Sequence, residues 1–249
     1  MTDSAEQAEL PAQTEVPAHT DSTEQTEVPA HTKVSAQNLA LPRTAWALQD
    51  PLLTEYYDTE WGRLITSERG LYERIVLESF QAGLSWLTVL KKREALREAF
   101  ADFDPEAVAE FTEQDVERLL ADARIIRNRA KIEAAITNAQ ATLALRESGG
   151  LAALVWSHTP ARSCVPATEE EIPSQTEESR ELARALRGQG FRFVGPTTAF
   201  ALMCAVGMVD AHVTSSHMRG VCGLRDAAGQ LTEEGRRFVD EVTAPATAP

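Results

Sequence analysis

Residues 78–93 bring together side chains that could bind a flat cationic ligand. Glu78 ends an apolar run typical of a helix that faces a core, where a carboxylate is rarely buried without a partner. Gly83 then interrupts the helical pattern, and Trp86 follows it. A carboxylate and an aromatic ring at one helix break could form a pocket for such a cation. Three consecutive cations at 91–93 could reach phosphate groups.

A second group of charges lies between two expected helices, in residues 122–132. Four cations fall within eight residues there, around an Ile125-Ile126 pair that could anchor a turn. These cations are Arg124, Arg127, Arg129 and Lys131. A short hairpin that leads into a helix presents backbone N–H groups, which suit a phosphate. A solvated turn with a basic face is the alternative, and the residue types alone leave both open.

Helices are expected to position both groups, because apolar residues recur at intervals of three and four. No stretch shows a convincing strand pattern, so the sequence predicts an all-α fold. The prolines in 157–175 predict a long loop, and Gly149-Gly150 is expected to end a helical region. The expected helices span 67–79, 84–99, 105–111, the segment after a capping box at 112–115, the stripe 132–143, then 176–187, 197–206 and 231–242.

Composition limits the classes of protein that this chain can belong to. Its 249 residues suffice for one large or two small domains, and no apolar run is long enough to cross a membrane. Three scattered cysteines and an N-terminus without signal-peptide character indicate a cytoplasmic protein. The net charge of −14 argues against indiscriminate nucleic-acid binding, so DNA binding would need a local basic patch.

Three segments are expected along the chain. Residues 1–40 contain seven acids and one base, and the octapeptide 13–20 recurs at 25–32, so they predict a disordered acidic tail. Residues 41–225 should form the helical domain, and 226–249 a partly disordered C-terminal extension. Aromatic residues gather at the start of the domain and could form either a core clasp or a pocket wall. They are Trp46, Tyr56, Tyr57 and Trp61.

A series of short motifs runs from about Arg43 to His212. Their order is Gln49-Asp50-Pro51-Leu52, Glu60-Trp61-Gly62, Leu77-Glu78, Gln81-Ala82-Gly83-Leu84-Ser85-Trp86, Thr88-Val89-Leu90-Lys91-Lys92-Arg93-Glu94, Phe103-Asp104-Pro105, Ile125-Ile126-Arg127, Lys131-Ile132, Glu171-Ile172-Pro173, Gly190-Phe191 and Phe193-Val194-Gly195. This series resembles the DNA-3-methyladenine glycosylase I family of the helix-hairpin-helix DNA glycosylase superfamily. The resemblance implies two helical lobes with a pocket between them and a monofunctional enzyme that flips out and hydrolytically excises N3-alkylated adenine in base-excision repair.

The resemblance also implies a role for individual residues. The pocket glutamate falls on Glu78. The aromatic residues that bind the base fall on Trp46, Tyr56 and Trp86. The residues that contact DNA fall on Gly83, Leu84, Ile125, Arg127, Arg129 and Lys131. The expected partner is double-stranded alkylated DNA, bound by a monomer without a cofactor.

The chain departs from the family in two places. The family carries a zinc ion whose four ligand positions fall on Thr44, Tyr57, His212 and Ser216. Only one of these is a zinc ligand, so we expect no metal, although His212, His217 and Cys222 could regroup around one. In the hairpin, Arg124 stands where the family usually has glycine, which could alter the approach of the backbone to phosphate.

Two alternatives remain at this point. The pocket could serve a bulkier alkyl adduct, as self-protection would require, or the chain could bind damaged DNA without turnover. Retention of Glu78, Tyr56 and Trp86 favours catalysis. Adenine alkylated at N3 is a cation and a good leaving group, so the main cost is to extract it from the stack.

Overall fold

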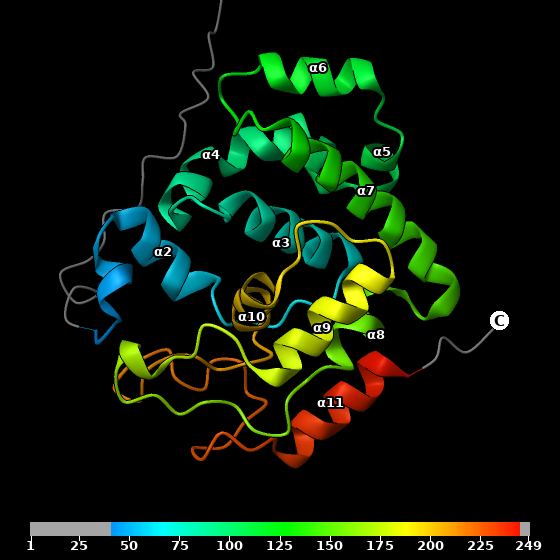
Figure 1. Cartoon of the computed structure of the whole chain (residues 1–249). Helices are drawn as coiled ribbons and strands as arrows, with labels where there is room; N and C mark the ends of the chain where they lie inside the picture. Colours follow the sequence, from blue (N-terminus) through cyan, green and yellow to red (C-terminus); the bar gives the residue numbers. More distant parts are fainter. Residues whose placement is uncertain (1–40, 245–249) are drawn as a thin grey trace, which may run out of the picture. The chain divides into compact units, whose positions relative to one another are not determined.

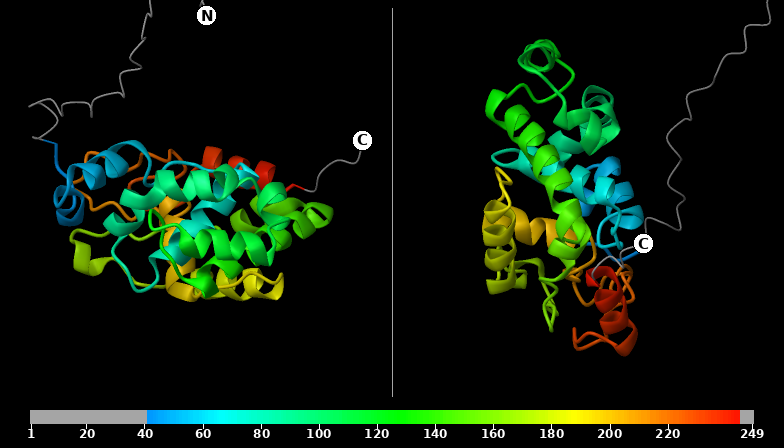
Figure 2. Two further views of the ribbon diagram at one scale, coloured as in Figure 1. Left: turned by 90° about the horizontal axis from the view of Figure 1, so that it is seen from above. Right: turned by 90° about the vertical axis from the view of Figure 1, so that its right-hand side faces the viewer.

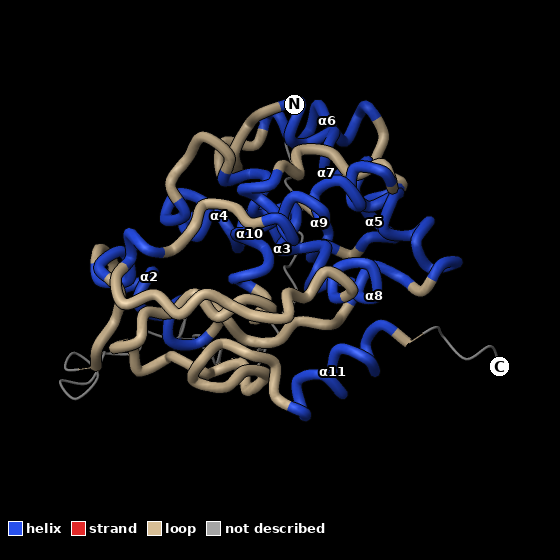
Figure 3. The backbone as a smooth tube through the Cα atoms, turned by 60° about the horizontal axis from the view of Figure 1, so that its bottom comes forward, coloured by secondary structure: helices blue, strands red, loops and turns tan. Residues whose placement is uncertain are grey.

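The computed structural model describes residues 41–244, and the predictions for the acidic tail and for the last five residues lie outside this range. Within it the fold is all-α, as predicted, with two isolated β-bridges and no strand (Figure 3). The helices, shown in Figure 1, are η1 (Ala45–Leu48), α2 (Pro51–Thr59), α3 (Glu68–Gln81), α4 (Trp86–Ala99), η2 (Ala101–Phe103), α5 (Pro105–Ala109), α6 (Glu113–Ala121), α7 (Arg129–Leu145), η3 (Arg146–Ser148), α8 (Gly150–Trp156), η4 (Glu169–Glu171), α9 (Glu177–Gly188), α10 (Pro196–Ala205) and α11 (Glu233–Thr243). No helix in this part of the chain is both long and apolar enough to span a bilayer.

Helix α3 is the centre of the fold. It packs against α4, α7, α8 and α10, and most of its residues from Leu71 to Phe80 are buried. The apolar helix α10 lies beside it, as its sequence predicts. The hydroxyl of Tyr72, fully buried in α3, donates to the carbonyl of Ala135 in α7. Because α3 is held on several sides, a side chain on it has a fixed position.

Local signals in the sequence set the ends of the helices near the site. The Ser67 side chain accepts from Gly70 N at the start of α3, and Ser85 accepts from Thr88 N at the start of α4. Gly83, with φ of 80°, turns the chain between these helices. Asn128 accepts from Lys131 N and so begins α7.

Helix α8 was not predicted from the sequence. Gly149 and Gly150 both have positive φ, and they end the helical stretch that begins with α7, as predicted, but a further helix starts directly at Gly150. Trp156 at the end of α8 is fully buried, and its indole N–H donates to the carbonyl of Ile65. Helix α11 packs on α8, with the Phe238 ring 5.0 Å from that of Trp156. In the right-hand view of Figure 2, α6 lies at the top of the helical domain and α11 at the bottom.

The loops after α8 and α10 lie side by side (Figure 3). Ser163 N donates to Gly229 O at 2.8 Å, and Thr214 N donates to Pro166 O at 2.8 Å. The buried guanidinium of Arg225 donates to backbone carbonyls from both loops. Extended irregular chain is thus held by backbone pairing and by one buried cation.

Candidate active site

A cavity of about 450 Å³ opens between the first helices, α10 and the loop after α8. Glu78 and the three aromatic residues predicted to bind a base, Trp46, Tyr56 and Trp86, all line it. The opposite side comes from Phe200 and Cys204 of α10 and from residues 172–174. These four residues therefore line one pocket, and their role in binding a base stays a prediction.

Glu78 lies on the buried face of α3 with 6% of its surface exposed. Its carboxylate forms no hydrogen bond with any residue in the described part of the chain. Burial raises its pKa to about 7, and the charge of Arg74 partly opposes this shift. The charged carboxylate is therefore costly to the free protein and would be stabilised by a cation in the cavity.

Beneath Glu78 lies an ionic network that sequence reasoning did not identify. Arg74 lies one helical turn before Glu78, and it donates to Tyr56 Oη at 3.2 Å and to Glu60 Oε2 at 2.8 Å. Arg93 forms a two-pronged pair with Glu60 at 2.7 and 2.8 Å. Although burial opposes ionisation of Glu60, the two arginines hold its pKa below the usual value. Glu60 thereby offsets part of the positive charge beside Glu78.

The aromatic residues that line the cavity also contact one another. Tyr56 and Trp86 have ring centroids 5.2 Å apart at 50°, and Trp46 meets Trp61 edge to face at 5.4 Å. The guanidinium of Arg74 lies 5.2 Å from the Tyr56 ring centroid, which fixes that ring from below. The buried Trp86 Nε1 has no hydrogen-bond partner within residues 41–244. An acceptor on a ligand could meet this donor.

The Gly83-Leu84 turn projects from the end of α3. Leu84 is 41% exposed, and the position of a Cβ on Gly83 would have no neighbour within 4 Å. Lys131 Nζ donates to the carbonyls of Phe80 and Ala82 at 2.9 and 2.7 Å. This ammonium compensates the free carbonyls at the C-terminus of α3 and holds the turn from α7.

The hairpin before α7 differs from expectation in how its charges are used. Lys131 is only 7% exposed and its ammonium is used inside the protein, while its predicted contact with DNA stays a prediction. Arg129 is paired with three glutamates from α6 and α7. Arg124 is paired with Asp122 and Glu98. The side chain of Ile125 is buried as an anchor, while Arg127 is exposed without an ion pair to the rest of residues 41–244.

Three of the positions that correspond to zinc ligands in the resemblance, Tyr57, His212 and Ser216, form one cluster of side chains. Tyr57 Oη and Ser216 Oγ are hydrogen-bonded at 2.6 Å in the interior. The His212 ring lies edge to face against Tyr57 at 5.1 Å. A phenol and a hydroxyl are not the ligands of structural zinc, so these residues do not fit the ion. Within residues 41–244, no three His, Cys, Asp or Glu side chains are grouped so that they could hold a metal ion.

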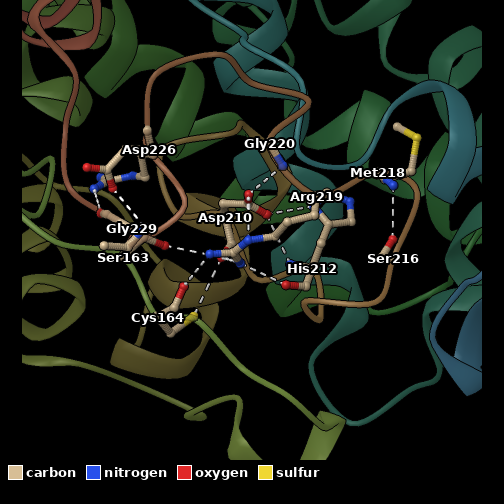
Figure 4. Close-up of polar contacts among 12 residues, drawn as sticks. Ser163, Cys164, Asp210, His212, Ser216, Met218, Arg219, Gly220, Asp226 and Gly229 are labelled. Atoms are coloured by element: carbon tan, nitrogen blue, oxygen red, sulfur yellow. Dashed lines mark hydrogen bonds and ion pairs between the residues drawn. The ribbon is translucent and has the colours of Figure 1, made fainter.

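Polar contacts around Asp210 hold the same C-terminal loop (Figure 4). Asp210 Oδ1 pairs with His212 Nδ1 at 2.8 Å, and Oδ2 accepts from Gly220 N at 2.8 Å. Arg219 donates to the carbonyls of Asp210, His212 and Cys164. His217 has a separate partner, the carbonyl of Pro42 at 2.9 Å. The regrouping of histidines and Cys222 around a metal therefore finds no support in these contacts.

An all-helical fold that places an unpaired carboxylate among aromatic rings, next to a projecting turn and a hairpin that begins a helix, defines the class of helix-hairpin-helix DNA glycosylases. Within this class the chain belongs to the methyladenine glycosylase family, whose model matches residues 46–219.

Similar proteins agree with this assignment. DNA-3-methyladenine glycosylase 1 of Escherichia coli (strain K12) is 48% identical over 177 residues, which cover 70% of this chain and 94% of that protein. The DNA-3-methyladenine glycosylase of Haemophilus influenzae is 42% identical over 175 residues, 69% of this chain and 94% of that protein. A solved structure of 3-methyladenine DNA glycosylase I from Staphylococcus aureus, concerned with its recognition of 3-methyladenine, has a TM-score of 0.69 at 34% identity and covers 72% of this chain and 97% of that one.

Proposed function

We propose that the protein is a monofunctional DNA glycosylase that flips N3-alkylated adenine, foremost 3-methyladenine, out of DNA and hydrolyses its glycosidic bond in base-excision repair. The observation that carries this proposal is the buried Glu78 carboxylate, which has no hydrogen-bond partner of its own and faces an aromatic cavity. The structural relatives that bind 3-methyladenine support the choice of base.

The mechanism follows from the charge of the damaged base. The faces of Tyr56 and Trp86 attract the cationic ring, and Glu78 accepts hydrogen bonds from its amino group. The bond between N9 and C1′ breaks with its electron pair going to the base, which leaves as a neutral molecule. Water adds to C1′ and gives its proton to solvent. Since the base is already a good leaving group, this chain needs to supply extraction and charge stabilisation rather than a strong acid.

The roles on DNA follow from where the residues project. We assign Gly83 and Leu84 to the gap in the base stack, and Arg127, with the backbone that starts at Ile125, to a phosphate. We also assign Arg129 to the DNA-binding surface. Its charge is expected to contribute less than that of Arg127, because its glutamate partners already compensate it. A pocket completed by one chain supports action as a monomer, and we place that action in the cytoplasm.

A defined assay tests the activity. The purified protein is incubated with methylated duplex DNA, the released bases are separated by chromatography, and the strands are analysed with and without alkali. We expect 3-methyladenine and abasic sites that break only in alkali. Strand cleavage with a borohydride-trapped protein–DNA adduct would contradict the monofunctional mechanism, and tight binding without release would indicate a non-catalytic relative.

The size of the cavity favours one second candidate. A volume of about 450 Å³ lies in the range that binds molecules larger than a single base. Small side chains line part of it, including Ala201, Cys204 and Ala211. A bulkier N3-alkyl substituent would then be excised at a rate comparable to methyl, which the same assay measures on DNA carrying N3-benzyladenine.

A further inference from the structure

The segment that joins α9 to α10 displays two side chains that the proposed mechanism does not use. Phe193 is 44% exposed, and its backbone has φ of 55°, a left-handed conformation that is rare for a bulky residue. Arg192 is also exposed, and its side chain makes no hydrogen bond or ion pair with the rest of residues 41–244. Phe191 and Val194 on either side are buried at 2% and 3%.

Buried side chains hold the backbone of Arg192 and Phe193 in place. Asn138 of α7 is fully buried, and its Oδ1 accepts from Arg192 N at 2.7 Å. Its Nδ2 donates to Arg192 O at 3.2 Å, so one side chain binds both backbone groups of the same residue. Ser79 of α3 donates to Phe193 O at 3.4 Å. A segment fixed in this way loses little conformational freedom when it binds a partner.

Helix α7 supports this segment together with the two elements already assigned to DNA. Lys131 holds the Gly83-Leu84 turn, and Asn138, seven residues later, lies on the same face two turns along. The hairpin with Arg127 leads directly into the same helix. Figure 1 shows the segment after α9 arching toward α3 and α7. Three exposed elements therefore share one support, helix α7.

We propose that Arg192 and Phe193 form a second DNA-contacting element, which acts beside the Leu84 turn. Arg192 binds a backbone phosphate, and the Phe193 ring packs against a base or sugar exposed where the duplex opens. Exposed aromatic rings and apolar wedges next to a cation are suited to a partly unstacked duplex. This inference rests on the proposed function, because it takes duplex DNA as the substrate.

The test uses Phe193→Gly in the full chain, because glycine adopts a φ of 55° without strain. We expect thermal stability equal to or above that of the wild type, while affinity for a duplex with an abasic site falls about tenfold. Affinity for free 3-methyladenine should stay unchanged, as should the salt dependence. Arg192→Ala should instead reduce the slope of log K against log salt by about 0.9.

The matched control is Leu64→Ala. Leu64 is 37% exposed but precedes the opposite end of α3, about 20 Å along the helix from Gly83. This control should bind DNA as the wild type does. Unchanged duplex affinity in Phe193→Gly, or a loss of stability and of free-base binding together with it, would overturn the inference. Failure of the wild type to release 3-methyladenine would instead count against the proposed function.

Discussion

Replacement of Glu78 by glutamine should stabilise the protein, and more so at high pH. In the folded state burial raises the pKa of Glu78 to about 7, compared with 4.5 for an ordinary glutamate. The folded protein therefore binds a proton more tightly than the unfolded chain does. Such a group lowers stability as pH rises from about 4.5 to about 7, and the cost is complete above that range. Glutamine keeps the shape of the side chain and removes this cost.

The size of the effect follows from the shift. A difference of about 2.5 pKa units at 1.36 kcal/mol each is about 3 kcal/mol. The free energy of unfolding of Glu78→Gln, relative to the wild type, should therefore be larger at pH 8 than at pH 4.5 by about this amount. Urea unfolding at a series of pH values measures the difference directly.

The exposed Glu55 of α2 offers a control for the glutamine substitution. Glu55→Gln should change stability little, and by the same amount at both pH values. If the free energy of unfolding of Glu78→Gln, relative to the wild type, does not depend on pH, the Glu78 carboxylate is solvated. That result would refute the interpretation of Glu78 as a buried carboxylate that is stabilised when a cationic base binds. Free 3-methyladenine should also bind the wild type more weakly below pH 7.

Three further predictions concern the DNA surface, the cluster of Tyr57, His212 and Ser216, and the N-terminal residues. Arg127→Ala should weaken binding to damaged and undamaged DNA alike and reduce the slope of log K against log salt by about 0.9. Arg129→Ala should change this slope less, because glutamates already compensate the charge of Arg129. Equal slopes for the two variants in titrations at several salt concentrations would contradict this. Tyr57→Phe should lower the free energy of unfolding by about 1 kcal/mol through loss of the bond to Ser216, and metal analysis of the wild type should find no stoichiometric zinc; one zinc per chain would be the opposing result. Deletion of 1–40 removes a net charge of −6, so DNA binding at low salt should tighten while melting temperature and excision rate stay the same; a markedly lower melting temperature would show that these residues are docked.

Much of the site could be predicted from the sequence because its signals are local. The apolar run before Glu78, the interruption at Gly83 and the tryptophan that follows lie within a few residues of one another, and the structure brings Glu78 and Trp86 to one cavity. The all-α fold follows from equally local periodicity and caps.

The parts that could not be predicted depend on partners far away in the chain. The sequence around Lys131 predicts a cation on the surface, whereas in the structure its ammonium binds the distant backbone carbonyls of residues 80 and 82. Arg129 loses its free charge to glutamates of α6, and Glu60 gains two arginines from α3 and α4. Helix α8 was missed because two glycines normally end a helix, and here they end one helical stretch and also begin the next. Tertiary contacts decide each of these cases.

The most direct test of the central claim is the single-turnover rate at which Glu78→Gln releases 3-methyladenine from methylated DNA. The measurement is made at pH 8, where the wild-type carboxylate is charged, and with enough protein to saturate the DNA. Loss of a charge in a site with little water should reduce the rate by orders of magnitude, while affinity for undamaged DNA stays the same. A variant that excises as fast as the wild type would contradict the assignment of the buried carboxylate as the group that stabilises the departing base.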